Sequence, residues 1–380
     1  MDLTYTPEEE AFRLRVRAWI AEHMPRGGTR ETEALRAWQR QLNEAGFLGS
    51  AWPSGSEHGG GRLTPMEQAI FNEELARADA PEPLGSMGLS WVGPAILRFG
   101  TDAQKRRFIP RLLRGDDVWA TGYSEPNAGS DMYNTQTRAV RDGDDYVING
   151  QKIWTSLAHL SNWYFLLVRT SSEGHKVAGL SLLLVPMQTP GIEIRPIRMI
   201  NGDSEFSEVF LRDVRVPQSA RLGAENQGYE IVSSALVNER SGIATAIRFD
   251  RSFAELLQTA RRFGKAGDPL WRQRLAHLAT QARIMNAFGL RVLSDQLAGR
   301  FNPHTSAAMK CMATLLSQEF SEAGMELQGE YGALVGKEHG PDDRDWATRY
   351  LTDRAMTIAG GTTEIQRNIV AERILGLPRS

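Results

Sequence analysis

The carboxylate whose sequence position best suits proton transfer is Glu239, in the segment Tyr229–Ile247. Apolar residues of this segment recur at the spacing of one helix face, at Val232, Leu236, Ile243 and Ala246. Glu239 follows Leu236 by three residues and precedes Ile243 by four, which places it on that face. Burial raises the pKa of a carboxyl group, as a general base requires. A buried Glu paired with Arg240, or with an arginine of another helix, is the alternative.

A second candidate is the segment Tyr123–Asp131, which reads YSEPNAGSD. It combines hydroxyl groups with small residues, a proline and a glycine, a composition typical of loops whose backbone can come close to a ligand. Ser124 and Ser130 would supply hydroxyl groups there. A plain surface loop is the alternative.

The third candidate is Trp154-Thr155-Ser156, at the end of a predicted strand. A tryptophan beside two hydroxyl groups could stack on a flat ring system and hydrogen-bond to the edge of that ring. A tryptophan that simply packs into the core is the alternative.

The fourth candidate is the segment GGTTEIQR, residues 360–367. Gly360 and Gly361 lead into a predicted helix start, with Thr363 and Gln366 as a capping box. The free N–H groups and the positive dipole end of such a start suit an anionic or carbonyl ligand. Many helices begin in this way without binding anything.

The pattern along the chain predicts three domains that position these residues. Residues 1–117 are predicted as an N-terminal helical domain, with a capping box at Thr6–Glu9 and helices at Leu35–Leu42, Met66–Ala78 and Asp102–Leu113. Residues 118–225 are predicted as a central β domain, a barrel-like or sandwich fold, because the apolar period changes from helical to strand-like. Residues 226–380 return to the helical period and are predicted as a C-terminal four-helix bundle. The fold class is therefore α+β and multidomain.

Within the β domain the sequence predicts two apolar strands, one alternating strand and one hairpin. Trp163–Arg169 and Gly179–Val185 are short apolar runs bounded by turn residues, and Glu208–Val216 alternates. Asn149-Gly150 predicts the type I′ turn of a hairpin, with Tyr146–Ile148 and Gln151–Trp154 as its strands.

Composition excludes several classes of function. The 380 residues carry 44 Lys and Arg against 46 Asp and Glu, so no surface built for nucleic acid or anionic lipid is expected. The one cysteine, Cys311, excludes an intrachain disulfide, and the histidine spacings favour no metal site. No apolar run reaches the roughly 18 residues of a membrane span. A soluble cytoplasmic protein without membrane insertion is expected.

The four motifs, in this order, resemble those of the acyl-CoA dehydrogenases. YSEPNAGSD is similar to the TEPxAGSD loop of that family, and QKIWTS is similar to its K-x-W-I-T-N strand. GDSEFSEVFLRDVRVP resembles the third β-domain signature, and GGTTEIQRNIVAERILG resembles the C-terminal segment that wraps the flavin. The resemblance covers nearly the whole chain and implies the acyl-CoA dehydrogenase fold.

The resemblance implies FAD as the cofactor and places its binding residues. Tyr123 and Ser124 would meet the polar edge of the flavin ring, and Ser130 would bridge towards the substrate and the cofactor phosphates. Trp154, Thr155 and Ser156 would pack on the isoalloxazine face. The C-terminal helix would contribute Gly361, Thr362, Thr363 and Glu364.

The resemblance also implies the reaction, α,β-dehydrogenation of an acyl-CoA to the trans-2-enoyl-CoA. Many family members carry the catalytic Glu where this chain has Gly360, whose backbone N–H can still bind the thioester carbonyl. A smaller set places the base in a Leu-x-x-Glu-Arg context, which Leu236–Arg240 matches and which selects Glu239 again. Asn238, Arg240 and Ser130 would contact the substrate. Electrons would pass to an electron-transfer flavoprotein.

Two motifs depart from the family pattern. The Arg-x-x-Phe-Gly stretch that binds FAD pyrophosphate reads ARRFG at residues 260–264, with the arginine displaced to Arg261 or Arg262, and the Gln-x-x-Gly-Gly stretch reads ELQGE at residues 326–330. Similar losses occur in heteromeric α2β2 enzymes acting on steroid side chains and in subunits for dicarboxylic acyl-CoA esters. A homotetramer and an α2β2 assembly both remain open. A partner subunit that completes another chain's FAD site and a tailoring dehydrogenase or oxidase are the alternative functions. The small residues around Trp91 suggest room for a bulky acyl group, namely Gly85, Ser86, Gly88, Ser90 and Gly93.

Overall fold

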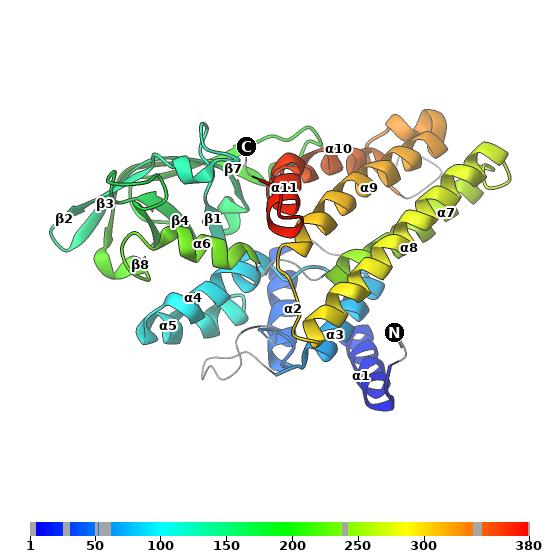
Figure 1. Cartoon of the computed structure of the whole chain (residues 1–380), viewed down its shortest axis with the longest axis horizontal. Helices are drawn as coiled ribbons and strands as arrows, with labels where there is room; N and C mark the ends of the chain where they lie inside the picture. The colour runs from blue at the N-terminus through cyan, green and yellow to red at the C-terminus, as the bar shows by residue number, and fades with distance from the viewer. Residues whose placement is uncertain are drawn as a thin grey trace. The chain divides into compact units, whose positions relative to one another are not determined.

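The computed structural model describes residues 5–25, 31–49, 52, 62–237, 242–336 and 344–378 (Figure 1). The chain divides into two compact units. The first comprises Met1–Ile20, Pro65–Asp79 and Arg240–Ser380, and the second comprises Ala21–Thr64 and Ala80–Glu239. Each unit is therefore built from segments that are far apart in the sequence.

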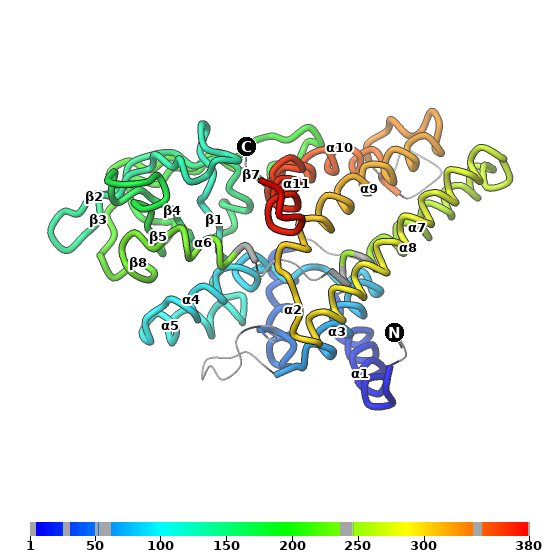
Figure 2. Tube along the Cα trace, in the orientation of Figure 1, coloured from blue at the N-terminus to red at the C-terminus, as the bar shows by residue number. Residues whose placement is uncertain are grey.

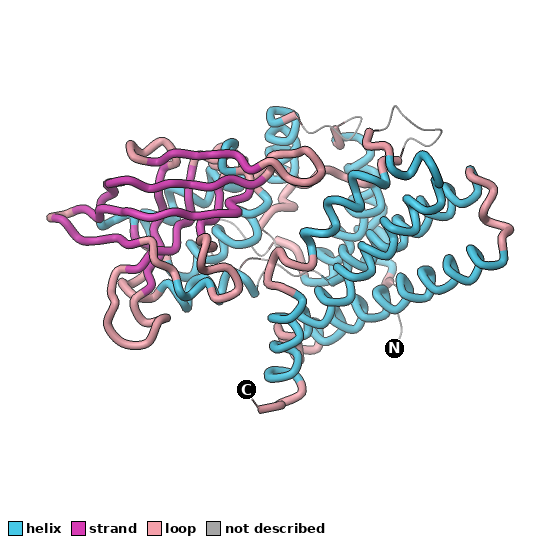
Figure 3. Tube along the Cα trace, turned by 90° about the horizontal axis from the view of Figure 1, so that it is seen from above, coloured by secondary structure: helices cyan, strands magenta, loops and turns pink. Residues whose placement is uncertain are grey.

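The second unit contains every strand of the described chain. Its strands are β1 (Trp119–Gly122), β2 (Arg138–Asp142), β3 (Asp145–Ser156), β4 (Trp163–Arg169), β5 (Leu180–Pro186), β6 (Ile192–Ile197), β7 (Phe206–Pro217) and β8 (Arg221–Leu222). Its helices are α2 (Thr32–Glu44), a π-helical turn (Gly88–Val92), α4 (Gly93–Phe99), α5 (Asp102–Leu113) and α6 (Gly228–Val237). The strands form one mixed sheet in the order β6-β7-β3-β2-β4-β5-β8, and β1 pairs with β4 (Figure 3).

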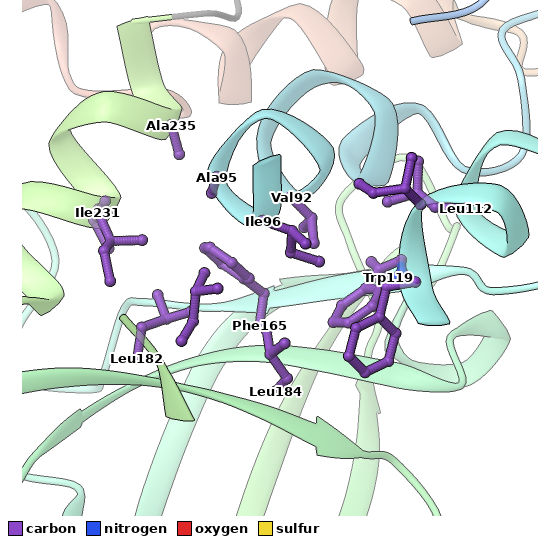
Figure 4. Packing of buried hydrophobic residues seen from close by; sticks show 14 of the residues in the cluster. Val92, Ala95, Ile96, Leu112, Trp119, Phe165, Leu182, Leu184, Ile231 and Ala235 are labelled. Carbon is purple, nitrogen blue, oxygen red and sulfur yellow. The ribbon is translucent and has the colours of Figure 1, made fainter. Parts of the chain in front are cut away.

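The alternation of side chains along β4 and β5 builds two cores in this unit. Tyr164, Leu166 and Val168 face residues of β3 and β7 in one core. Phe165 and Leu167 point to the opposite face. There they pack against α4, α5 and α6, as Figure 4 shows for Phe165 beside Ile96. Because both faces of these strands are covered, their sequence is a continuous apolar run rather than an alternating one.

The predicted hairpin at Asn149-Gly150 is wrong. β3 runs through this dipeptide without a turn, and the hairpin lies between β2 and β3, where Gly143 has a φ of +60°. Asn149 instead exchanges hydrogen bonds of 2.9 and 3.0 Å with Asp213 of β7. Gly150 is required for close approach, because a Cβ there would lie 2.5 Å from the Thr137 hydroxyl.

The first unit is helical. Its elements are α1 (Pro7–His23, up to the unit boundary at Ile20), α3 (Pro65–Ala78), α7 (Gly242–Arg262), α8 (Pro269–Leu297), α9 (Thr305–Gln328), a 3-10 turn (Gly329–Ala333), α10 (Trp346–Met356), α11 (Thr363–Ile369) and a π-helical turn (Val370–Ile374). Figure 2 shows α7, α8 and α9 side by side. Their core includes Phe249, Met285 and Phe320. Trp346 of α10 joins it, and its indole N–H donates to the Thr259 hydroxyl at 3.1 Å.

Local capping explains where several helices begin. The predicted capping box of α1 is confirmed, since the Thr6 amide donates to the Glu9 carboxylate at 2.8 Å and the Glu9 amide donates to the Thr6 hydroxyl at 3.3 Å. α5 begins with a second capping box, formed by Thr101 and Gln104. Among the described helices, none is long and apolar enough to cross a bilayer.

Candidate active site

Glu125 fixes both ends of the polar loop after β1, one end through its carboxylate and the other through its backbone. The carboxylate accepts hydrogen bonds from the backbone amides of Gln136 at 2.7 Å and Thr137 at 2.9 Å, where the chain leaves the loop. At the loop entrance, Glu125 and Ala128 pair through both backbone hydrogen bonds, which closes a tight turn. One residue, Glu125, therefore holds both ends of the segment that presents Ser130, which is exposed.

Lys152 of β3 joins this loop to the strand that carries Trp154. Its ammonium lies 2.8 Å from Glu125 Oε1 and donates to the Tyr123 carbonyl at 3.1 Å. The Lys152 side chain is fully buried and that of Glu125 is 6% exposed. Burial lowers the pKa of Lys152 to about 8, while the carboxylate raises it by a smaller amount. Burial also raises the pKa of Glu125, but the charge of Lys152 and the donated hydrogen bonds outweigh it, so that this pKa lies below its usual value.

The lowered pKa of Lys152 has a consequence for stability. An unfolded lysine has a pKa of roughly 10.4, so between pH 8 and 10 the unfolded chain binds more protons than the folded chain. Stability then rises with pH in this range. We expect the wild type to gain stability relative to Lys152→Met as the pH is raised from 8 to 10, measured by urea unfolding. A stability difference that stays constant across this range would contradict the assignment.

A β-bulge turns Trp154 outward. Lys152 pairs with Val209 and Thr155 pairs with Ser207, so three steps along β3 match two along β7. The extra residue lets Lys152 and Thr155 both face inward. Trp154 takes a left-handed φ of +59° and its side chain is 54% exposed. Such a backbone conformation is unfavourable for a bulky residue and is characteristic of functional sites. The alternative that Trp154 is a core residue is wrong.

The neighbours of Trp154 divide between core and surface. Thr155 is buried and its hydroxyl lies 3.0 Å from that of Tyr164, so its side chain is committed to the core. Ser156 is half-buried. Ser124 is also half-buried, and its carbonyl accepts from the Ile153 amide at 3.0 Å. This unit thus brings an exposed indole together with the hydroxyl-bearing loop held by Lys152.

Tyr123 faces the apolar cluster beneath the loop. Its ring centroid lies 6.4 Å from that of Trp91 and 6.3 Å from that of Phe165. Trp91 belongs to the π-helical turn, which contacts α6. Tyr123 therefore packs against the turn that contacts α6.

The glycines near Trp91 serve packing. A Cβ at Gly93 would lie 2.5 Å from the Trp52 ring, and one at Gly88 would lie 3.3 Å from Leu112 and Trp119. A Cβ at Gly85 would lie 3.1 Å from Gln39. The space beside each of these glycines is filled by side chains, so the inference of room for a bulky acyl group from them is wrong.

In the first unit, the N-cap of helix α11 lies one residue earlier than predicted. The N-cap of α11 is Thr362, whose hydroxyl accepts from the Ile365 amide at 3.3 Å. Gln366 is buried and donates to the Gly360 carbonyl at 2.8 Å instead of completing a capping box with Thr363. Thr363 is buried and its amide donates to the Thr357 carbonyl at 2.9 Å.

Gly360 and Gly361 both have left-handed backbones, with φ values of +65° and +89°. Gly360 is exposed, and a Cβ there would meet nothing within 4 Å. A Cβ at Gly361 would lie 2.7 Å from the Gln366 amide nitrogen. Beneath the loop, the Lys310 ammonium of α9 donates to the Gly361 carbonyl. Glu364 is exposed.

Three predicted residues, Asn238, Glu239 and Arg240, lie outside the described residues. α6 is described up to Val237 and α7 from Gly242.

The two departures from the family pattern lie at one end of the helical unit. α7 ends at Arg262 and α9 ends at Gln328, and the rings of Phe263 and Tyr331 just beyond them are 6.3 Å apart. Arg261 and Arg262 are exposed. Glu326 pairs with Arg274 of α8, and the Gln328 amide donates to the Arg344 carbonyl at 3.2 Å.

Sequence reasoning missed Glu125, Lys152 and Lys310 as organising residues. Glu125 and Lys152 stand inside motifs singled out for other residues, and 27 positions separate them. A lysine at the alternate position that continues the apolar residues Tyr146 and Ile148 was the available signal. Lys310 gave none, since its partner is a backbone carbonyl 51 residues away.

Helices before and after a strand region along the chain, together with these motifs in this order, are the organisation of an acyl-CoA dehydrogenase. The N-terminal, middle and C-terminal domain models of the acyl-CoA dehydrogenases match residues 6–116, 120–214 and 226–375. The chain belongs to the acyl-CoA dehydrogenase family and is an oxidoreductase.

Individual relatives match this chain over nearly its full length. The chain is 41% identical to acyl-CoA dehydrogenase IpdE1 of Mycobacterium tuberculosis, over 97% of this chain and 98% of that protein. It is 34% identical to FadE26 of the same species, with both chains fully covered. Among solved structures, the Tcur3481-Tcur3483 steroid acyl-CoA dehydrogenase matches with a TM-score of 0.88 and 29% identity, with both chains fully covered. The ChsE4-ChsE5 complex from Mycobacterium tuberculosis matches with a TM-score of 0.86 and 34% identity, also over both full chains.

Proposed function

We propose that this chain is the catalytic, FAD-binding subunit of an acyl-CoA dehydrogenase. It would convert an acyl-CoA thioester to the trans-2-enoyl-CoA, with Glu239 as the base. The observation that carries the proposal is the outward, left-handed Trp154, held beside the Ser124–Ser130 loop by the buried pair of Lys152 and Glu125. The family membership supplies the reaction class.

The described residues fit an isoalloxazine ring. The exposed indole of Trp154 offers a flat apolar face, and the half-buried hydroxyls of Ser156 and Ser124 offer polar groups on the same edge of the sheet. Because the Thr155 side chain is turned into the core, we assign only its backbone to the cofactor. Tyr123 and Ser130 complete this group. Gly361, Thr362, Thr363 and Glu364 would meet the cofactor from the C-terminal loop.

The chain's own residues would perform the proton transfer. The Gly360 N–H would donate to the thioester carbonyl and stabilise the negative charge that develops on its oxygen. Glu239 would take the α-proton, and Asn238, Arg240 and Ser130 would hold the substrate. Bound FAD would supply the acceptor for the β-hydrogen, which leaves as hydride.

Replacing Trp154 with alanine should weaken flavin binding and leave the fold intact. The side chain is largely exposed, so its loss removes little core packing. An aromatic stacking contact contributes about 0.5–1.5 kcal/mol beyond buried area, so we expect the flavin dissociation constant to rise by about tenfold. Fluorescence titration of the apoprotein with FAD measures this. Trp154→Phe should retain most of the affinity, and an unchanged constant for the alanine variant would contradict the assigned stacking.

The substrate and assembly proposals come from the relatives. Two similar structures are a steroid acyl-CoA dehydrogenase and a complex of two named chains. We therefore propose a bulky acyl group, of the steroid side-chain kind, and an assembly of four subunits, either of one chain or α2β2 with a related chain. An electron-transfer flavoprotein would accept the electrons.

A second candidate function is that of a partner subunit completing another chain's FAD site. The altered stretches 260–264 and 326–330 favour this candidate. In the second stretch, Glu326 pairs with Arg274 and Gln328 donates to the Arg344 carbonyl. The test is the visible spectrum of the purified chain expressed alone. About one flavin per chain supports the catalytic proposal with a homotetramer. A colourless chain that becomes yellow only when co-expressed with a related subunit supports the α2β2 assembly.

A further inference from the structure

We propose that Lys310 is a positioning residue for the dehydrogenation, which holds the Gly360-Gly361 loop so that the Gly360 N–H is directed at the thioester carbonyl. The inference rests on the proposed function and adds to it a residue that no sequence motif indicated. Its evidence is the set of contacts that fix this loop in the helical unit.

The loop is fixed mainly through its carbonyl groups. The Gly360 carbonyl accepts from the Gln366 amide at 2.8 Å, and the Gly361 carbonyl accepts from the Lys310 ammonium. On either side, the Ala359 amide donates to the Ala355 carbonyl and the Thr363 amide donates to the Thr357 carbonyl, both at 2.9 Å. The peptide between Ala359 and Gly360, which carries the Gly360 N–H, therefore lies between two peptides that hydrogen bonds hold in place.

Lys310 is the strong connection between this loop and another helix. Ala355 and Thr357 lie at the end of α10 and Gln366 lies in α11, so their bonds tie the loop only to the two helices that it joins. From α9, the Lys310 ammonium reaches the loop directly. The neighbouring Cys311 thiol makes a weaker contact of 3.7 Å with the Thr363 carbonyl. Lys310 stands on a helix whose Met309 and Thr314 are buried, so the ammonium is held by a rigid element.

The loop needs such a connection because its own residues restrict it little. Two successive glycines have more backbone freedom than any other pair. Gly360 is exposed and has no neighbour within 4 Å of its Cβ position. A backbone N–H stabilises a developing oxyanion only when it is already aimed at the position of that oxygen. Loss of the Lys310 contact should therefore affect the carbonyl interaction specifically.

The test compares two ligands that differ at the carbonyl. The probes are the acyl-CoA thioester turned over fastest by the wild type, from a panel of straight-chain, branched and steroid side-chain thioesters, and the S-alkyl-CoA thioether with the same chain. Binding is measured by calorimetry on the flavin-loaded protein carrying Glu239→Gln, which should leave the thioester intact. The variants are Lys310→Met, Lys310→Arg and, as a control, Lys105→Met, which removes an ion pair with Asp102 in the other unit.

Lys310→Met should weaken thioester binding about five- to tenfold, as expected for one hydrogen bond, and should leave thioether binding unchanged. Lys310→Arg keeps a charged donor and should restore thioester binding to within about twofold. Lys105→Met should change neither. Equal weakening of both ligands, or no weakening of either, would overturn the proposal, because a merely structural role gives no discrimination between them.

Two further measurements keep the result decisive. If Lys310→Met does not fold, Gln366→Met releases the adjacent carbonyl and should show the same selective loss; its absence would contradict the positioning role. If the Glu239→Gln protein still oxidises the thioester, the assigned base is wrong. The selective effect of Lys310→Met on the thioester is then measured as the change in the ratio of the thioester KM to the thioether inhibition constant.

Discussion

Replacing Glu239 with glutamine is expected to lower turnover by at least about a thousandfold while the chain keeps its flavin. A positioned general base contributes roughly 10²–10⁴-fold, and Glu239 is the base proposed to take the acyl-CoA α-proton. Glutamine has the same shape as glutamate, so folding and cofactor binding should be unaffected. The measurement is dye-coupled turnover normalised to bound flavin, together with exchange of the substrate α-proton in D₂O.

The matched control is Glu230→Gln, on the described part of the same sequence segment. Its carboxylate is half exposed and lies 3.7 Å from Arg98, so its loss should cost little stability and no activity. Retained α-proton exchange in Glu239→Gln would contradict the assignment. The described part of α6, which precedes Glu239 in the sequence, buries Ile231, Val232 and Ala235 completely.

Lys152→Met should destabilise the protein by about 3–5 kcal/mol, because it leaves the Glu125 carboxylate buried without its cation. The loop from Tyr123 to Ser130 and the bulge at Trp154 are both attached to this pair, so flavin content should fall as well. Urea unfolding and the visible spectrum of the purified variant measure the two effects.

An exposed ion pair of the same kind provides the control. Lys176 lies 2.8 Å from Asp131, the same separation as in the buried pair, but its side chain is 48% exposed and that of Asp131 is 53% exposed. Lys176→Met should therefore cost no more than about 1 kcal/mol. Equal stability of Lys152→Met and Lys176→Met would contradict the claim that burial determines how much the Lys152–Glu125 pair contributes to stability.

Elements defined by local signals could be predicted from the sequence to the residue. Asp102–Leu113 and Trp163–Arg169 were predicted with the bounds that the structure shows, because a capping box begins the helix and polar residues bound the apolar strand. The family and its fold also followed from four motifs in order. The division into three domains, with boundaries after residues 117 and 225, remains a prediction.

Features that depend on distant residues could not be predicted. Asn149-Gly150 has the composition of a turn, but Asp213 and Thr137 decide that it lies within a strand. The outward placement of Trp154 depends on a bulge against β7, which a single strand's pattern does not reveal. Two adjacent threonines, Thr362 and Thr363, could each cap α11. Thr362 is the N-cap because of its backbone geometry, which residue type does not reveal.

The central claim is that this chain uses its own flavin to dehydrogenate acyl-CoA thioesters. The most direct measurement is the visible flavin absorbance of the purified chain during anaerobic titration with the thioester panel. We expect a yellow protein whose flavin absorbance bleaches with one equivalent of substrate, and a Glu239→Gln protein whose absorbance does not bleach. A yellow protein that no thioester in the panel bleaches, or a chain that binds no flavin even with a related subunit, would contradict it.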